Sequence, residues 1–196
     1  VGFALSSGQK SAGTVYVDYL TWDGEPNVVF KRPAHDGTLW RRAWVDGTDQ
    51  SDYRWPETYR IVQNAGTGLL IQGTRDWKNY RVSADLTPHL AQSAGIGIRV
   101  QGIRRYYGLF LSNEVAVNLV KALDGQKVLA SKPYTWKFGQ TYQLELAAKG
   151  NHIQGWINGE LVVDVQDTDN PLESGAAALI ISEGRSATDK VTVTPA

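Results

Sequence analysis

The stretch AGIGIRVQGIRRYYGLFLSN, residues 94–113, decides the fold, because apolar residues alternate with other residues on both sides of a turn. Alternation with a period of two is typical of β-strands, in which successive side chains point to opposite faces. The first strand therefore places three apolar residues on one face: Ile96, Ile98 and Val100. In the second strand Tyr106 and Tyr107 are neighbours, so they must point to opposite faces. The stretch predicts a strand, a turn that contains Arg104 and Arg105, and a second strand.

Short runs of the same kind follow one another along the whole chain and are separated by Gly, Asn, Asp and Pro. The expected strands lie at residues 13–22, 27–33, 38–45, 59–73, 80–88, 94–102, 106–113, 115–123, 127–134, 141–150, 152–159, 160–167, 175–184 and 189–195. Residues 59–73 are interpreted as a hairpin with glycines at its turn, and TPHLAQS (87–93) is the one helical candidate. About a dozen strands at spacings of roughly 8–12 residues indicate an antiparallel sandwich or barrel.

We expect one large β domain with an addition at its N-terminus. Residues 23–37 contain two prolines and several turn formers, which marks a boundary. A lone strand at 13–22 has no core of its own, so it must pair with the rest of the chain. We therefore predict an N-terminal extension, residues 1–50, whose strands pack on a β-sandwich at residues 51–196. The predicted fold class is all-β: a two-sheet antiparallel sandwich of the jelly-roll type.

Composition and charge exclude several classes of function. Twenty basic and 20 acidic residues cancel, so no overall field favours nucleic acid or an anionic membrane. No run of about 18 apolar residues occurs, so we expect no membrane insertion. There is no cysteine, hence no disulfide and no thiolate site. The sequence starts VGFALSSG, and we interpret it as a fragment covalently linked to further domains of a larger protein.

From about residue 57 to its end, the sequence resembles the concanavalin A-like (laminin G-like) β-sandwich domains of bacterial carbohydrate-active proteins. Four segments carry the resemblance: GLLIQGTRDWKNYRVSADL, AGIGIRVQGIRRYYGLFLSN, QTYQLELAAKGNHIQGWINGELVVDVQDTD and GAAALIISEGRSATDKVTV. The opening, GTVYVDYLTWDGEP with LWRRAWVDG, is similar to the C-terminal accessory region of ADP-ribosylglycohydrolase-family proteins. The resemblance implies a glycan or polysaccharide partner and an extracellular or periplasmic location.

The same resemblance implies a structural Ca²⁺ near the last strand. Asp189 matches the position of an aspartate that holds calcium in such sandwiches, together with backbone carbonyl groups. Calcium takes six to eight oxygen ligands, and a sequence does not show which carbonyls would supply them. The alternative is that Asp189 begins an edge strand in water.

The sequence lacks the carboxylate pattern of a glycoside hydrolase on this fold. Hydrolysis of a glycosidic bond needs two carboxyl groups that face one cleft, and residues two apart in a strand share a face. Glu145 stands alone, whereas Glu160 and Asp164 lie beside a tight turn. We expect no metal site from the three histidines, which lie far apart in loops or strand starts and are best interpreted as solvated: His35, His89 and His152. We therefore expect no catalysis, with a hydrolase on the same fold as the alternative.

Outward faces of the expected strands carry the candidate ligand contacts. Aromatic rings stack on the C–H faces of sugars, and Arg, Gln and Asn pair with hydroxyl groups or, for Arg, with a carboxylate. The candidates are Arg99, Gln101, Arg104, Arg105, Tyr106, Tyr107, Asn118 and Trp156. We expect a carbohydrate-binding module that tethers a larger bacterial protein to a glycan through an open face of one sheet. The second alternative is a structural or protein-interaction module, because outer faces also carry such residues for strand pairing alone.

Overall fold

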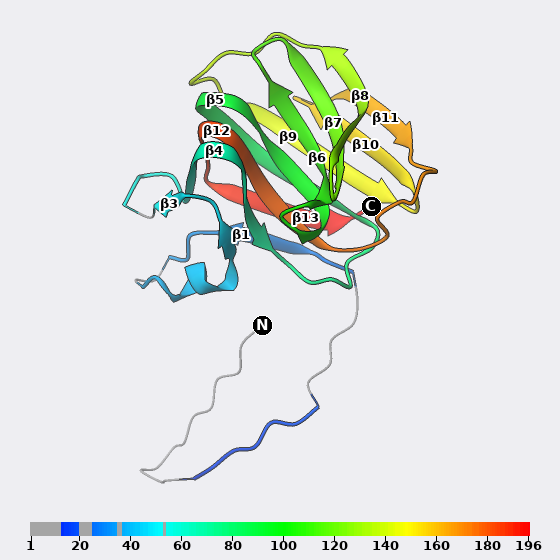
Figure 1. The fold of residues 1–196 in the computed structure, drawn as a ribbon. Helices are drawn as coiled ribbons and strands as arrows, with labels where there is room; N and C mark the ends of the chain where they lie inside the picture. Colours follow the sequence, from blue (N-terminus) through cyan, green and yellow to red (C-terminus); the bar gives the residue numbers. More distant parts are fainter. Residues whose placement is uncertain (1–12, 20–24, 35–36, 53) are drawn as a thin grey trace.

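The fold is described from a computed structural model, which describes residues 13–19, 25–34, 37–52 and 54–196 (Figure 1). All the strand pairs are antiparallel, and two sheets enclose one large apolar core. The prediction of an all-β, two-sheet antiparallel sandwich is therefore confirmed. In the described part of the chain, no helix has the length and apolar character needed to cross a membrane.

The regular elements of the described residues are short strands, three long strands and one 3-10 helix. In chain order they are β1 (Val28–Lys31), η1 (Leu39–Ala43), β2 (Val45–Gly47), β3 (Gln50–Asp52), β4 (Tyr59–Gln72), β5 (Tyr80–Gly102), β6 (Arg105–Ser112), β7 (Ala116–Leu123), β8 (Gln126–Pro133), β9 (Tyr142–Lys149), β10 (His152–Ile157), β11 (Glu160–Gln166), β12 (Ala176–Thr188) and β13 (Lys190–Pro195). The long strands are β4, β5 and β12, and β12 lies between the other two.

Strand β5 belongs to both sheets. Its first part, residues 80–86, pairs with β9 and β13, in a first sheet ordered β11-β10-β9-β5-β13-β1. Its later part pairs with β6 and β12, in a second sheet ordered β8-β7-β6-β5-β12-β4, with β2 and β3 beside β4. The strand turns back between these parts, because the Tyr80 hydroxyl accepts a hydrogen bond from Arg99 N (2.6 Å). The middle of β5 thus lies at one end of the sandwich, and its two termini lie at the other end.

The side chains of the second sheet alternate as the sequence predicts. Tyr107, Leu109 and Leu111 are buried in the core between the sheets. Tyr106 and Phe110 point to the opposite side, where they form a second apolar cluster with residues of β4, β5, β7 and β12. The prediction that Tyr106 and Tyr107 point to opposite faces is therefore confirmed.

One residue of β5 breaks the expected alternation. Arg99 has φ 51°, in the left-handed region that is rare for a residue with a side chain. Ile96 and Ile98 pack in the main core as predicted, but Val100 belongs to the cluster on the opposite side. The left-handed residue shifts the alternation by one position, so the prediction that Val100 shares a face with Ile96 is wrong.

Other predicted elements differ from those observed. Residues 59–73 are one strand rather than a hairpin, and TPHLAQS is part of β5 rather than a helical turn. Residues 38–45 contain the 3-10 helix η1, and residues 13–19 form no regular element. Pro88 does not end β5. Instead, the pairing of β5 with β12 shifts its register beside this proline.

The residues before position 53 complete both sheets. Strand β1 pairs with β13 at one edge, whereas β2 and β3 pair with β4 in the other sheet. Aromatic rings join this part to the core, with ring centroids 5.4 Å apart for Phe30 and Trp44, and 4.7 Å apart for Trp44 and Tyr59. The N-terminal strands therefore share the sandwich core.

Candidate functional site: a groove at the bend of β5

Three of the candidate ligand contacts hold a loop of the protein itself. The 167–175 loop joins β11 to β12. Arg99 Nη1 donates to Leu172 O (2.6 Å), and Gln101 Nε2 donates to Ser174 O (3.0 Å). The Tyr107 hydroxyl donates to Asp167 Oδ2 (2.5 Å) and accepts from Leu172 N (2.9 Å). Burial raises the Tyr107 pKa most, and the bond to Asp167 raises it further, so Tyr107 remains a neutral donor.

The other candidate contacts do not converge on one face. Tyr106 is only 1% exposed, because it packs in the cluster of the second sheet, and Asn118 is half-buried opposite Phe110. Arg104 and Arg105 are exposed at the turn after β5, where Arg105 pairs with Asp124 (2.6 Å). Trp156 lies on the first sheet, with the Arg81 guanidinium 4.5 Å from its ring centroid.

The predicted open face is therefore wrong in its central residues. Arg99 and Tyr107, which are 1% and 0% exposed, are buried together with Tyr106. The physical reason is the left-handed Arg99, which turns its side chain towards the 167–175 loop. Period-two alternation places a side chain on a face only while the backbone stays extended.

Asp189, the predicted calcium ligand, has a structural partner. Its Oδ1 accepts a hydrogen bond from Thr58 N (3.1 Å), which joins the end of β12 to the start of β4. Across the described residues, no group of three or more His, Cys, Asp or Glu side chains is placed to hold a metal ion. His35 lies outside the described residues.

A broad concave surface lies where β5 bends. This groove has a volume of about 620 Å³. It is lined by Val62, Gln63 and Asn64 of β4, Leu90, Ala91 and Gln92 of β5, Glu183, Gly184 and Arg185 of β12, and by Glu114 and Phe138. The groove thus combines two carboxylates, one guanidinium, three amide side chains and one exposed ring.

The first carboxylate stands on a tight turn between β6 and β7. Asn113 and Glu114 have φ 48° and 60°, and Val115 N donates to Ser112 O (3.2 Å), as in a type I′ turn. Such turns favour Asn-Gly, because glycine adopts a positive φ without steric cost. The chain has that pair at the β10–β11 hairpin, where Asn158 and Gly159 have φ 51° and 81°. Glu114 therefore occupies a position where glycine is more stable.

The second carboxylate stands on a β-bulge of β12. The register of β12 against β4 shifts between Ser182 and Gly184, and Glu183 has φ 44°. Gly184 has φ 148°, and a Cβ there would lie 1.7 Å from Leu90 O. β-Bulges reorient a side chain at the point where they interrupt a ladder, and they are frequent near functional sites. Glu183 is thereby turned into the groove.

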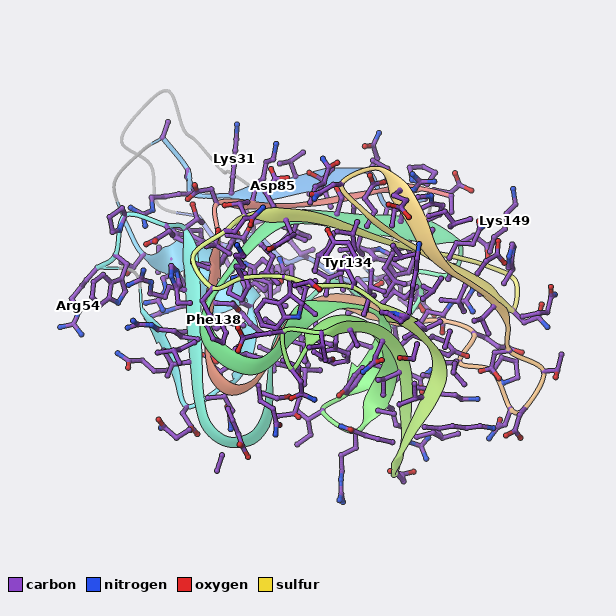
Figure 2. All side chains as sticks on the ribbon, turned by 90° about the horizontal axis from the view of Figure 1, so that it is seen from above. Lys31, Arg54, Asp85, Tyr134, Phe138 and Lys149 are labelled. Carbon is purple, nitrogen blue, oxygen red and sulfur yellow. The ribbon has the colours of Figure 1, made fainter. Side chains whose placement is uncertain are left out.

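A buried tryptophan positions the ring of the groove. Trp136 is 1% exposed, and its Nε1 donates to Ser112 O (3.4 Å). The ring of Phe138 packs edge-on against it, with centroids 5.3 Å apart. Gly139 N donates to Pro88 O (2.7 Å), which fastens this segment to the bend of β5. Figure 2 shows Phe138 at one end of the sandwich and Lys149 at the other.

A polar cluster surrounds His89, which precedes the groove residue Leu90 in sequence. Arg60 Nη2 donates to Glu57 Oε1 (3.0 Å) and lies 3.3 Å from His89 Nε2, while its guanidinium lies 4.2 Å from the Trp55 ring centroid. Burial lowers the His89 pKa, and the charges of Arg60 and Arg185 lower it further. A neutral His89 therefore accepts the hydrogen bond from Arg60 through Nε2. The interpretation of His89 as a solvated loop residue is wrong, because it is a half-buried part of β5.

Glu114 and Glu183 were not predicted from the sequence. The sequence pattern typical of a hydrolase on this fold is a pair of carboxylates two positions apart in one strand, whereas these two come from different elements that meet only in the fold. A local signal was present at Glu114, since it follows an Asn in a tight turn where glycine is usual.

Comparisons with solved structures support the sandwich. A carbohydrate-binding module, CBM66 from Bacillus subtilis, has a TM-score of 0.69 and 15% identity over 77% of this chain and 94% of the other. A B. subtilis protein of unknown function with a galectin-like fold has a TM-score of 0.63 and 14% identity over 81% and 92%. A mutant Trypanosoma rangeli sialidase has a TM-score of 0.59 and 12% identity over 84% and 30%. These likenesses show the fold. The comparison with curated proteins gives no match.

One family is shown by the sequence itself. Its profile matches residues 22–191, which include every strand from β1 to β12 and the first two residues of β13. The match therefore covers strands of both sheets and every residue that lines the groove. The chain belongs to the family described as the 3-keto-alpha-glucoside-1,2-lyase-like domain.

Proposed function

We propose that this chain is a carbohydrate-recognition domain that holds a glycan in the groove at the bend of β5. The observation that carries the proposal is the lining of that groove. An exposed ring, Phe138, suits the C–H face of a sugar. The carboxylates, the guanidinium and the amides offer acceptors and donors to sugar hydroxyl groups. Within a larger bacterial protein, outside the cytoplasm, the domain would tether its parent to the glycan without catalysis.

The comparisons support a sugar as the ligand class. The family description names an alpha-glucoside, and one similar structure is a carbohydrate-binding module. The backbone strain at two glutamates of the groove also supports a binding site there. A left-handed backbone costs a residue with a side chain on the order of 1 kcal/mol, and such strain is concentrated at functional sites. Glu114 and Glu183 are both strained in this way, and both line the groove.

Glu114→Gly should separate stability from binding. The substitution gives the β6–β7 turn the Asn-Gly pair of the β10–β11 turn, so we expect unfolding free energy to rise by about 1 kcal/mol. The lost carboxylate should weaken glycan binding at least about tenfold, as expected when a charged hydrogen-bond partner is removed. Urea titration measures the first effect. A glycan array followed by calorimetry with the best ligand measures the second.

The matched control is Glu160→Gln, which removes an exposed glutamate that pairs with Lys132 away from the groove. It should leave both the affinity and the unfolding free energy unchanged. If the wild-type chain binds no neutral or acidic glycan, the proposal fails. If Glu114→Gly binds as tightly as the wild type, the ligand does not lie in the groove.

The family description favours a second candidate function, lyase activity on a 3-keto glucoside. The 3-keto group makes the C2 proton acidic, so a carboxylate base would remove it. The electron pair then forms the C1=C2 bond as the C1–O bond breaks, and an acid protonates the leaving oxygen. Glu114 and Glu183 line one groove and suit these two roles.

Incubation with methyl 3-keto-α-glucoside tests this second candidate. Elimination produces a C1=C2–C3=O enone. Its ultraviolet absorbance should grow with time for the wild-type chain, and no such increase should occur for the Glu183→Gln variant. The binding function predicts no enone at all. Enone formation that survives Glu114→Gln and Glu183→Gln would place the chemistry elsewhere in the chain.

A further inference from the structure

A second pocket lies at the opposite end of the sandwich from the groove. It has a volume of about 290 Å³ and is lined by Lys78, Asn79, Arg99, Gly150, Asn151, Pro171 and Glu173. Figure 2 shows Lys149, the neighbour of Gly150 in sequence, at the end of the sandwich away from Phe138. We name this cavity the Arg99 pocket.

Arg99 brings a positive charge into this pocket, and the charge of Glu173 acts on it from beyond ion-pair distance. Arg99 is 1% exposed, and it forms no ion pair with any other described residue. A guanidinium has five N–H donors. Nε donates to Lys78 O (3.1 Å) and Nη1 donates to Leu172 O (2.6 Å), whereas Nη2 has no acceptor in the described part of the chain. A buried cation is costly unless an anion or full hydrogen bonding compensates it.

The backbone fixes the position of Arg99, and its left-handed conformation costs conformational free energy. The residue is left-handed, and Gly175 packs directly on it: a Cβ at Gly175 would lie 2.4 Å from Arg99 C. Tyr80 fixes the same segment, since its hydroxyl accepts from Arg99 N and donates to Gly175 O (2.8 Å). The guanidinium is therefore fixed at the inner wall before any ligand arrives.

The remaining polar groups of the pocket are mostly donors. Asn79 Oδ1 accepts from Gly150 N (3.0 Å), and Asn151 Oδ1 accepts from Gln166 Nε2 (2.7 Å). Both amide oxygens are thus occupied, which leaves the two amide nitrogens as donors. The exposed Lys78 side chain makes no ion pair with any described residue. Glu173 is the single acid in the lining, and it forms no ion pair with Arg99.

We propose that the Arg99 pocket binds the carboxylate group of an acidic sugar such as a uronic acid. Lys78 and the amide nitrogens of Asn79 and Asn151 donate to the carboxylate at the mouth, and Arg99 supplies the fixed charge behind them. The site is separate from the groove and does not depend on the function proposed for it. Two sites at opposite ends would let one domain contact two residues or chains of an acidic polysaccharide.

Titration of the whole chain with sodium glucuronate, followed by ¹⁵N–¹H NMR, tests the proposal. We expect the amide signals of Asn79, Gly150 and Asn151 to shift, with a dissociation constant on the order of 1 mM, because an open pocket buries little of a monosaccharide. Glucose should shift none of them. Asn151→Asp keeps the acceptor for Gln166 but adds a negative charge, so it should abolish the shifts, and Lys78→Ala should weaken binding about tenfold.

Two control variants test whether glucuronate binds in the Arg99 pocket rather than in the groove. Lys137→Ala removes an exposed lysine next to Phe138 and should leave glucuronate binding unchanged. Glu114→Gly should also bind glucuronate normally, whatever it does to other glycans. The proposal is overturned if the pocket amides do not respond to glucuronate, if glucose shifts them equally, or if Asn151→Asp binds as the wild type does. Tighter binding of sulfate than of glucuronate would overturn the assignment to a carboxylate.

Discussion

Asp167→Ala is expected to lower the unfolding free energy by about 3–5 kcal/mol, the cost of leaving one member of a buried ion pair alone. Lys121 Nζ lies 2.7 Å from Asp167 Oδ2, and the two side chains are 5% and 3% exposed. The Tyr107 hydroxyl donates to the same oxygen. Lys121 also donates to Asp169 O and Asn170 O, so the pair fixes the first half of the 167–175 loop. Urea denaturation of the variant measures the loss.

The chain supplies a matched control for this pair. Lys127 and Asp169 form an ion pair 3.1 Å long in which the side chains are 63% and 77% exposed. Because exposed pairs contribute about 0–1 kcal/mol, Lys127→Ala should change stability by no more than about 1 kcal/mol. A loss below about 1 kcal/mol for Asp167→Ala would contradict the structural role assigned to the buried pair.

The same aspartate makes stability depend on pH. Burial raises the Asp167 pKa, but hydrogen bonds from Lys121 and Tyr107 outweigh it and hold the pKa below its ordinary value of 3.8. A carboxyl with a lowered folded-state pKa stabilises the fold above its unfolded pKa, and this contribution is lost as pH falls through the folded-state value. The wild type should therefore lose more stability in acid than Asp167→Asn does, when urea curves at neutral pH are compared with curves below pH 3.8.

Gly184→Ala is expected to cost about 3 kcal/mol or more, because it combines overpacking with backbone strain. A Cβ at this position would lie 1.7 Å from Leu90 O and 2.4 Å from Ala91 Cα, which are backbone atoms that cannot rotate away. The residue also has φ 148°, a conformation that side chains rarely adopt. Relief of the clash requires β5 and β12 to separate at the bulge, which would also displace Glu183. Thermal denaturation, together with the glycan titration, measures both effects.

Substitutions at two other glycines separate the cost of backbone strain from the cost of overpacking. Gly139 has φ 75°, and no atom lies within 4 Å of the place that a Cβ would take, so Gly139→Ala carries backbone strain alone. This strain should cost about 1 kcal/mol. Gly125 has open space and no positive φ, so Gly125→Ala should be close to neutral. If Gly184→Ala costs no more than Gly139→Ala, the close approach of β5 and β12 does not contribute.

The strands were predictable because alternation is a local property of the backbone. Tyr107, Leu109 and Leu111 are buried as their spacing requires, and Tyr106 lies on the opposite side. Arg99 was not predictable in this way. Its left-handed backbone is supported by Gly175 and Tyr80, which lie far from it in sequence and meet it only in the fold.

The candidate site was less predictable than the fold for a related reason. Arg99, Gln101 and Tyr107 have residue types that suit a sugar, but each bonds to the 167–175 loop, through Nη1 in the case of Arg99, so they form no open face. A sequence shows which groups are able to bind, whereas only the fold shows which of them already have partners. Glu114 and Glu183 were missed because the bend of β5 and the bulge of β12 bring their elements together.

The path of β5 through both sheets has a consequence for how the molecule opens. Where the two layers of a sandwich share no hydrogen-bonded strand, one layer can fray while the other persists. Here β9 and β13 pair with the first part of β5, and β6 and β12 pair with its later part. Separation of either sheet must break the pairing of β5, which makes the whole sandwich one cooperative unit. Exchange of the β5 amide hydrogens with solvent would then report the global unfolding free energy of the domain.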